Sequence, residues 1–402
     1  MCILKTALFF LSVIFILTSC SGLDEPEPIP PICPESMVFE PGGLVIEAGN
    51  NSTFALMDGS LWGWGSNHSG QLGNGDNTAW MVAHPIPMHI LDDVAFVSAG
   101  GSGGMVHIMA IRTDGSLWVW GRNHAGQVGD GTQNMRAYPV FIMDDIVAVS
   151  AGGGHSMAIC TENILWGWGC NCSGKIGNDT YVTQLLPIQI LEDVTYVSAG
   201  LLHTMAIRSD GTLWAWGYGG ALGIGKLESS NVPVMVMEDV VAVAAGGRHT
   251  LAICKNGSLW AWGHNNWGQL GAGNFHYDSN TPIHVMDNVI AVFAGYGHSA
   301  VIKSDNSLWV WGYNQYGQLG DGTTENSHTP IHLMDDVIAV TVGTMHSFTI
   351  ATKADHSIWS WGNNFWGQLG DGYYGFFYSH DTPVEMQLII DLTAEQEIRE
   401  IP

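Results

Sequence analysis

Positive charge is scarce in this chain. Its 402 residues include 12 lysines and arginines against 37 aspartates and glutamates, so the formal net charge at pH 7 is −25. Proteins hold nucleic acids mainly through basic side chains that pair with phosphates, so this balance argues against DNA or RNA binding. Disorder is excluded too, because 46% of the residues are hydrophobic and 10% are aromatic.

Long apolar runs are also rare. The run over residues 7–17 follows Lys5 and is too short to cross a bilayer as a helix, but it has the length of a signal-peptide core. It leads into Leu17-Thr18-Ser19-Cys20, which resembles the bacterial lipobox. We therefore expect a lipoprotein signal peptide and a membrane anchor through lipidated Cys20. An ordinary secretory signal with a chance cysteine is the alternative.

The remaining chain divides into three parts by composition. Residues 20–43 are rich in proline and acids and are expected to form a semi-rigid tether. Residues 44–390 carry the repeats described below, and residues 391–402 form a C-terminal tail. The expected location is the bacterial cell envelope, at the outer membrane or the cell surface.

Cysteine pairs and catalytic motifs are sparse. Among the seven cysteines only Cys170-Asn171-Cys172 forms a tight pair, which suggests a metal or redox pair, but no second Cys/His pair stands at ligand spacing. No G-x-S-x-G elbow, H-E-x-x-H helix or phosphate-binding loop is present. We expect no catalytic residue, no cofactor and no metal.

Glycine and tryptophan, in contrast, are abundant, with 52 and 17 residues. The phrase Leu-Trp-x-Trp-Gly explains most of the tryptophans, since it recurs seven times and ends in the variant Ile-Trp-Ser-Trp-Gly. The first tryptophans of the seven copies are Trp62, Trp118, Trp166, Trp214, Trp260, Trp309 and Trp359. Self-similarity at this period indicates a repeat architecture.

Each copy reads as four short strands. An alternating β-branched run precedes a glycine-rich break, a second run follows, and a turn such as Asp210-Gly211 leads into the Trp-x-Trp strand. After a Gly-Gln-Leu-Gly-Asp-Gly turn and a variable loop, a proline opens the fourth strand. With no helical periodicity, the pattern predicts an all-β fold: a seven-bladed β-propeller of four-stranded antiparallel blades. How the ring closes stays open.

The motifs Ala-Gly-Gly-x-His-Ser/Thr, Asp-Gly-Ser-Leu-Trp-x-Trp-Gly and Asn-x-x-Gly-Gln-Leu-Gly-Asp-Gly together resemble the repeat of the regulator of chromosome condensation family. The resemblance covers residues from about 44 to 387 and implies the propeller fold. The eukaryotic founder of the family is a chromatin-bound exchange factor for a small GTPase. Secreted bacterial relatives, including propeller-type β-lactamase inhibitory proteins, bind a protein through the loops of one face. No exchange-factor or inhibitor residue is carried over to this chain.

Two rings of polar residues follow from the repeat. One is a set of equivalent histidines, replaced by Asn51 in the first copy: His107, His155, His203, His249, His298 and His346. A metal or proton site is one interpretation, but we favour hydrogen bonds to backbone between blades, because an amide replaces an imidazole only in that role.

The second ring is acidic and precedes the inner strands from the second copy onward. Its eleven carboxylates are Asp92, Asp93, Asp144, Asp145, Glu192, Asp193, Glu238, Asp239, Asp287, Asp335 and Asp336. They are expected on one rim of the ring, either as solvated turn residues that keep the surface soluble or as a surface that attracts cations or a basic partner.

Aromatic residues in the loops after the Gly-rich turns break the repeat. They stand in the first, fifth and seventh copies and are Trp80, Phe275, Tyr277, Tyr373, Tyr374, Phe376, Phe377 and Tyr378. Scaffold packing does not require aromatics at unrepeated positions, whereas protein interfaces and sugar sites favour them. Local loop packing is the alternative.

These observations predict a tethered, exported propeller that binds a protein partner through loops on one face. The alternative is a carbohydrate-binding or carbohydrate-active propeller that uses the loop aromatics together with Asp278 or Asp381. A third function, guanine-nucleotide exchange, is suggested only by the family resemblance.

Overall fold

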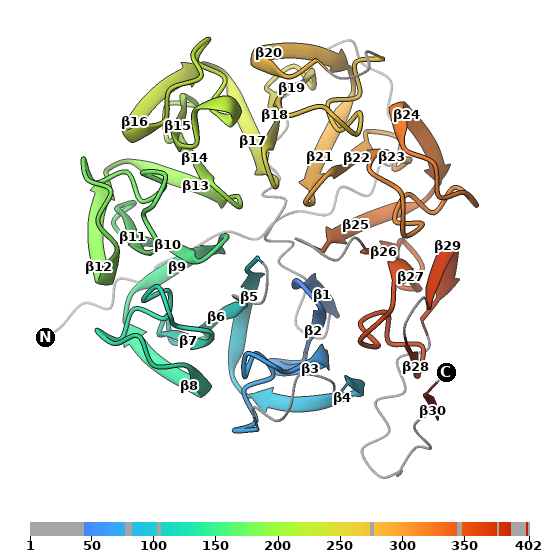
Figure 1. Ribbon diagram of the computed structural model, residues 1–402, viewed down its shortest axis with the longest axis horizontal. Coiled ribbons are helices and arrows are strands. Elements are labelled where there is room, and N and C mark those ends of the chain that lie inside the picture. The colour runs from blue at the N-terminus through green and yellow to red at the C-terminus, as the bar shows by residue number, and fades with distance from the viewer. Residues whose placement is uncertain are drawn as a thin grey trace, which may run out of the picture.

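The computed structural model describes residues 44–76, 83–102, 106–273, 277–343, 348–375 and 378–386, and the two strand residues Arg399–Glu400. Seven sheets of four antiparallel strands surround a central axis (Figure 1). The predicted all-β class and the seven-bladed propeller are confirmed. In the described residues the one helical element is η1 (Gly219–Ala221), a single 3-10 turn. None of the helices there is long and apolar enough to span a bilayer.

The strands of each blade follow in chain order from the axis to the outer edge (Figure 1). The first three blades are β1 (Val45–Ala48), β2 (Ser52–Met57), β3 (Ser60–Ser66), β4 (Ala83–Leu91); β5 (Val94–Gly100), β6 (His107–Arg112), β7 (Leu117–Gly121), β8 (Arg136–Met143); β9 (Ile146–Ala151), β10 (His155–Cys160), β11 (Leu165–Gly169), β12 (Gln184–Leu191). The fourth and fifth blades are β13 (Val194–Ala199), β14 (His203–Arg208), β15 (Leu213–Gly217), β16 (Ser230–Met237); β17 (Val240–Ala245), β18 (His249–Cys254), β19 (Leu259–Gly263), β20 (Ser279–Met286). The last two are β21 (Val289–Ala294), β22 (His298–Lys303), β23 (Leu308–Gly312), β24 (Ser327–Met334); β25 (Val337–Val342), β26 (Phe348–Lys353), β27 (Ile358–Asn363), β29 (Ser379–Glu385). Outside the blades, β28 (Tyr373–Tyr374) pairs in parallel with β30 (Arg399–Glu400).

The second tryptophan of each Trp-x-Trp pair packs between two blades. All seven are 0% exposed: Trp64, Trp120, Trp168, Trp216, Trp262, Trp311 and Trp361. Each indole N–H donates to a carbonyl of the preceding blade, as Trp216 Nε1 does to the Lys175 carbonyl at 2.9 Å. The first tryptophan of each pair is only half-buried. Burial of an indole with its N–H paired therefore ties every blade to its neighbour.

The turn that follows the third strand is organised by one buried asparagine. In the second blade, Asn123 Oδ1 accepts the Val128 N–H at 2.9 Å, and Asn123 Nδ2 donates to Asp130 Oδ1 and to the Thr132 carbonyl, both at 3.1 Å. The same bridge recurs with Asn67, Asn171, Asn314 and Asn364. The fourth blade has Gly219 in this place, and there the turn becomes η1.

The outer strands correct one expectation. The repeated proline does not open the fourth strand but lies inside it, as Pro187 does within Gln184–Leu191. The register between β11 and β12 shifts at this point, since Gly167 pairs with Ile188 and Gly169 with Gln184. The proline occupies this bulge on the edge strand, where no ladder hydrogen bond is lost.

The ring closes by side contact between the first and last blades. Among the described residues each of these blades contains only its own four strands, so the two blades share no strand there. The Ala48 N–H of β1 donates to Thr341 Oγ1 of β25 at 2.9 Å, and Trp64 Nε1 donates to the Gln368 carbonyl at 3.2 Å. A common apolar cluster that includes Trp64, Phe348 and Ile350 fills this seam.

Candidate functional site

Because neighbouring strands within each blade are antiparallel, their connecting turns lie alternately on the two faces of the propeller, and these faces differ chemically. We call one the acidic face: it carries the turns between neighbouring blades and the hairpin turns between second and third strands. These turns touch, because Val94 N at the start of one blade donates to the Gly59 carbonyl of the previous one at 2.8 Å. The opposite face, here the loop face, carries the turns after the first strands and the loops after the third strands.

The structure places all eleven carboxylates of the expected ring on the acidic face, where every one is exposed. The second residue of each pair has a left-handed backbone, for example Asp145 with φ 61° and Asn288 with φ 63°. Aspartate and asparagine are the non-glycine residues that tolerate this conformation best. The left-handed backbone of the turn therefore explains in part why aspartate or asparagine recurs at the second position of each pair.

Neighbouring side chains pair with several of these carboxylates. His89, His284 and His332 of the outer strands lie 2.8–2.9 Å from Asp92, Asp287 and Asp335. Arg112 pairs with Asp93 at 3.1 Å and stacks on the Trp118 ring. The hydrogen bond from His89 is the main reason why the pKa of Asp92 lies below its ordinary value.

The hairpin turns add six carboxylates that were not part of the expected ring: Asp58, Asp114, Glu162, Asp210, Asp305 and Asp355. They belong to the same face because strand direction alternates in every blade. Five cations close the second strands nearby: Arg112, Arg208, Lys255, Lys303 and Lys353. The acidic face is thus strongly negative even after its own cations are counted.

The histidine ring has five members in the structure, and two expected positions are wrong. Phe348 pairs with Gly362 as His298 pairs with Gly312, so Phe348 and not His346 holds the equivalent position in the last blade. His346 itself lies outside the described residues. In the first blade the position belongs to Ser52, which pairs with Gly65.

A shorter turn explains the shift in the first blade. The β2–β3 hairpin has a two-residue turn with positive φ at both Asp58 and Gly59. Its counterpart in the second blade has positive φ at Gly115 but not at Asp114, and is one residue longer. Asn51 therefore stands at the expected distance before Trp62 in the sequence, but Ser52 occupies the histidine position in the folded blade.

The five histidines link neighbouring blades through a hydroxyl. Each is 0% exposed, and its Nε2 lies 2.8–3.3 Å from a serine or threonine of the next blade. That hydroxyl donates its proton to a backbone carbonyl, as Ser156 does to Gln127 at 2.7 Å. Nε2 must then be the protonated nitrogen. The expected interblade role holds, but the direct partner is a side chain and not backbone.

Burial keeps these imidazoles neutral. It lowers the pKa of His107, His203 and His249 to about 3 and that of His298 to about 4. For His155 burial is again the main cause of a pKa well below the ordinary value, assisted by the nearby Lys175 ammonium. A group held neutral and 0% exposed is part of the scaffold and does not exchange protons with a ligand.

The loop aromatics expected as a binding surface are placed only in part. Tyr277 is 77% exposed and Tyr373 is 37% exposed, while Tyr374 and Tyr378 are half-buried. The other four, Trp80, Phe275, Phe376 and Phe377, lie outside the described residues. Asp278 Oδ1 accepts the Asn265 N–H at 2.8 Å, so this carboxylate caps its own turn.

The last loop builds a small polar cluster beside these aromatics. Tyr373 and Tyr378 lie with ring centroids 6.0 Å apart, and the Tyr378 hydroxyl is 3.4 Å from His380 Nε2. The same His380 nitrogen lies 2.9 Å from Asp371 Oδ2. Burial and the Asp371 charge raise the pKa of Tyr378 to about 12, so this hydroxyl stays protonated.

A second aromatic set was not recognised from the sequence. Trp267, Tyr316 and Trp366 occupy the same turn position in three consecutive blades, two residues after the buried asparagine, and we call them the aromatic arc. Their backbone N–H groups donate to the following glutamine side chains at 2.9–3.0 Å, so the turn holds each ring in place. Tyr316 is 43% exposed, and the two indoles are half-buried.

Other aromatics support the arc at both ends. Trp267 packs on Tyr313 with centroids 5.0 Å apart and on Tyr296 at 5.5 Å. At the seam of the ring, Trp366 packs on Phe365 at 4.6 Å and lies 6.2 Å from His68 of the first blade. The sequence contained a signal for the arc, because the first three blades have small residues at the same position, namely Ser69, Ala125 and Ser173.

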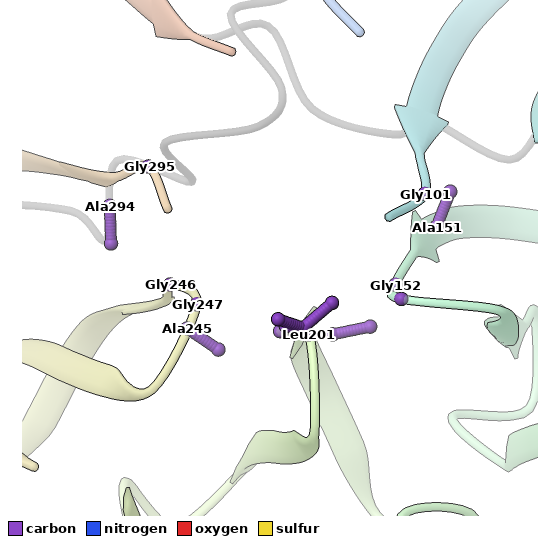
Figure 2. Close-up of a pocket in the computed structure, with 12 residues that line it drawn as sticks. Gly101, Ala151, Gly152, Leu201, Ala245, Gly246, Gly247, Ala294 and Gly295 are labelled. Carbon is purple, nitrogen blue, oxygen red and sulfur yellow. The ribbon is translucent and has the colours of Figure 1, made fainter. Parts of the chain in front are cut away.

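A central channel opens on the loop face. Its mouth is lined by the glycine-rich turns after the first strands, and the Leu201 side chain projects between Gly152 on one side and Gly246 and Gly247 on the other (Figure 2). Further in, the channel has a volume of about 110 Å³ and is lined mainly by small and apolar residues, with Glu47 among them. Glu47 Oε1 accepts the Ala99 N–H at 3.3 Å, so this carboxylate bonds to the wall of the channel.

Comparison with known proteins agrees with this architecture. A model of the RCC1-like domain matches residues 135–399, more than half of the chain, and a model of the regulator of chromosome condensation (RCC1) repeat matches residues 58–106. The ultraviolet-B receptor UVR8 of Arabidopsis thaliana is 36% identical over 98 residues, 24% of this chain and 21% of that protein. Protein RCC2 of Homo sapiens is 37% identical over 83 residues, 21% and 15% of the two chains. The chain therefore aligns with less than a quarter of the length of these relatives.

Solved structures share the fold at low identity. Human WBSCR16 superposes with a TM-score of 0.69 at 21% identity, over 82% of this chain and 94% of that one. Prp20p of Saccharomyces cerevisiae superposes with a TM-score of 0.71 at 19% identity, over 82% and 86%. With the domain match, the repeated motifs and seven four-stranded blades in agreement, this chain belongs to the RCC1-like domain family.

Proposed function

We propose that this protein is a binding module that holds a protein partner on its loop face, and that it is exported and tethered to the bacterial cell envelope through Cys20. The observation that carries the proposal is the aromatic arc. The scaffold does not need aromatics there, because the first three blades fold the same turn with serine or alanine. Tyrosine and tryptophan are enriched at the energetic centres of protein interfaces.

The family relationship supports protein binding as the class of function. The yeast propeller Prp20p has been solved in complex with Kap60 and is described as binding Gsp1p and histones. Those partners belong to that protein, and no residue of this chain has been matched to their recognition. Exchange activity on a GTPase therefore has less support here than binding alone.

The test of the binding surface is the triple variant W267A/Y316A/W366A. Alanine occupies this position in the second blade, so the turns are expected to fold. The matched control F141A/V232A/M235A removes three exposed apolar side chains from the outer strands. A partner recovered from envelope extract should bind the arc variant at least about tenfold more weakly than wild type and bind the control unchanged. Equal affinity for all three proteins would overturn the proposal.

A carbohydrate ligand is the second candidate, and one observation favours it. Trp267, Tyr296 and Tyr313 form a half-exposed cluster of rings, a surface on which sugars stack. Titration of the wild type and the arc variant with envelope polysaccharide distinguishes the two ligands. If only the polysaccharide binds, and binding is lost in W267A, the carbohydrate function replaces the protein-binding one.

Tethering is tested separately. A C20S variant expressed in the native cell should appear in the soluble extracytoplasmic fraction, whereas wild type should sediment with the membrane and incorporate a labelled fatty acid. If wild type is soluble and unlabelled, the protein is exported without an anchor or not exported, and the binding proposal stands unaffected.

A further inference from the structure

The loop of the third blade departs from the repeat at three residues that carry chemistry. Lys175 replaces the glutamine that the first, second, fifth, sixth and seventh blades have in this position. In those blades the glutamine Oε1 accepts the N–H of the residue two positions earlier, as Gln127 does from Ala125 at 3.0 Å. A lysine has no acceptor and cannot make this bond. The same loop also contains Cys170 and Cys172, which flank the bridging Asn171.

The Lys175 ammonium is buried with few partners. Its side chain is 1% exposed, and Nζ donates to the Gly153 carbonyl at 2.7 Å and to the Leu201 carbonyl at 3.3 Å. The thiols of Cys170 and Cys172 lie close enough to interact electrostatically with this ammonium. Burial lowers the pKa of Lys175, and the two cysteines oppose that shift. Both carbonyls belong to residues that line the mouth of the channel, of which Figure 2 labels Leu201.

The two thiols are in contact. Cys170 Sγ donates to Cys172 Sγ at 3.2 Å, and Cys172 is exposed to solvent while Cys170 is partly covered. Burial would raise the pKa of the Cys172 thiol, but the hydrogen bond from Cys170 and the Lys175 charge outweigh it and lower this pKa. Burial raises the pKa of Cys170. Cys172 is thus the accessible sulfur that ionises more readily, and Cys170 lies behind it.

A metal ion fits this pair less well than a disulfide. Two thiolates that share a zinc ion sit farther apart than the present sulfurs, since each lies about 2.3 Å from the metal in tetrahedral geometry. Within the described ranges no third His, Cys, Asp or Glu joins them as a ligand group. Formation of an S–S bond requires an approach of only about 1.2 Å from the present 3.2 Å.

We propose that Cys170 and Cys172 are a redox-active dithiol that is oxidised reversibly by a low-molecular-weight disulfide. The Cys172 thiolate attacks one sulfur of the oxidant, which forms a mixed disulfide and releases one thiol. Cys170 then gives up its proton, and its thiolate, stabilised by the Lys175 ammonium, attacks Cys172 Sγ and releases the second thiol. In balance, two protein thiols and one disulfide become one protein disulfide and two small thiols.

Oxidation has a defined structural consequence. A disulfide sulfur cannot ionise, so the buried Lys175 ammonium loses both thiols whose ionised forms oppose the lowering of its pKa. The two carbonyl bonds, to Gly153 and Leu201, remain. A redox change in this exposed loop therefore changes the electrostatic surroundings of the ammonium that bonds to Gly153 and Leu201 at the mouth of the channel. The inference does not depend on the proposed binding function.

The test is oxidation of the reduced protein with oxidised glutathione near pH 7.5, followed by peptide mass mapping without reduction. In wild type the peptide with Cys170 and Cys172 should lose two hydrogens, carry no glutathione, and return to the dithiol with dithiothreitol. C170S should instead accumulate a glutathione adduct on Cys172, because the second attack is missing. C172S should react slowly, since the remaining thiol is covered.

The role of the lysine is tested by K175Q, which restores the residue of the repeat and should keep the turn folded. Its oxidation should be about tenfold slower than that of wild type, because the ammonium no longer stabilises the thiolates. Cys254, a half-buried thiol outside the loop, is the internal control and should stay free. A stable glutathione adduct in wild type, or free thiols at both loop positions under these conditions, would overturn the proposal.

Discussion

Each of the five buried histidines is held in one tautomer, because the hydroxyl that its Nε2 contacts donates its own proton to a backbone carbonyl. His155, for example, donates from Nε2 to Thr204, which in turn donates to the Lys175 carbonyl at 2.7 Å. Protonation of Nδ1 would place a charge at a site with 0% exposure. The repeated histidines look reactive in the sequence, but in the structure burial and hydrogen bonding make them unavailable for reaction.

Acid should therefore destabilise the fold through these residues. The unfolded chain binds protons near pH 6.5, while the folded histidines bind them only near pH 3 to 4. The stabilisation is fully present above pH 6.5 and is lost as the pH falls, by about 1.4 kcal/mol per pH unit for each histidine. Urea unfolding at pH 7, 6 and 5 should show this steep decline.

H249F isolates one histidine of the set. Phenylalanine is tolerated in this position by the last blade, where Phe348 is 0% exposed. The variant should be less stable at pH 7, because Ser299 loses its hydrogen bond, but its stability should fall less steeply with acid by about 1.4 kcal/mol per pH unit. An unchanged slope would mean that His249 does not take up a proton on unfolding.

Among the elements, the asparagine-bridged turn is the unit that positions functional side chains. Its glycines are required for two separate reasons. Gly320 and Gly322 have φ of 72° and 80°, but a Cβ on Gly320 would lie 2.8 Å from Trp361 Nε1, whereas one on Gly322 would meet nothing closer than Thr382 Cγ2 at 3.7 Å. The first glycine makes room for the interblade tryptophan, and the second serves only the backbone.

The pair G320A and G322A separates these two causes. Both variants should lose about 1 kcal/mol from the left-handed backbone, and G320A should lose about 1–3 kcal/mol more because the indole must move. Equilibrium denaturation of the two proteins measures the difference, and Trp361 fluorescence should change only in G320A. Equal destabilisation would show that the indole has space to adjust.

The elements also show where reasoning from the sequence succeeded and where it failed. The four strands of every blade were predictable, because alternation, turn dipeptides and the Trp-x-Trp phrase all have local causes. Ser52 was missed because equivalence was counted along the chain, while strand register decides it in space. Phe348 was missed because the prediction followed the histidine His346 and not the fixed distance to the tryptophan. The aromatic arc was missed because the turns around Trp267 and Trp366 otherwise follow the repeat. Only an alignment of the seven copies shows that this one position changes from small residues to aromatic ones.

For the whole molecule, the dominant electrostatic feature is the acidic face. Its carboxylates sit at the same height around one ring, and several positions already need a left-handed aspartate or asparagine for the turn. Like charges gathered on one face destabilise the folded state at low ionic strength. The two sets of 11 and 6 carboxylates make 17 of the 37 acids of the chain, so the acid excess is concentrated on this face and is not spread evenly.

D145N tests this with a control of the same geometry. Asp145 and Asp179 are both exposed with φ 61°, but Asp145 lies on the acidic face and Asp179 on the loop face. At low salt D145N should raise the melting temperature by about 1–2 °C and D179N should leave it unchanged. In 0.5 M salt the gain of D145N should vanish, and a gain that persists there would point to a cause other than charge.

The sequence by itself determined the fold class, the number of blades, the order of strands and the family, because each copy repeats the local signals that build one blade. Three features were decided only in three dimensions: the seam between the first and last blades, the register that puts Ser52 at the histidine position of the first blade, and the contact of Cys170 with Cys172 near the buried Lys175. These features depend on distances between side chains, which a linear pattern does not contain. The same holds for the aromatic arc, which exists as a surface only because three blades bring one turn position to one face.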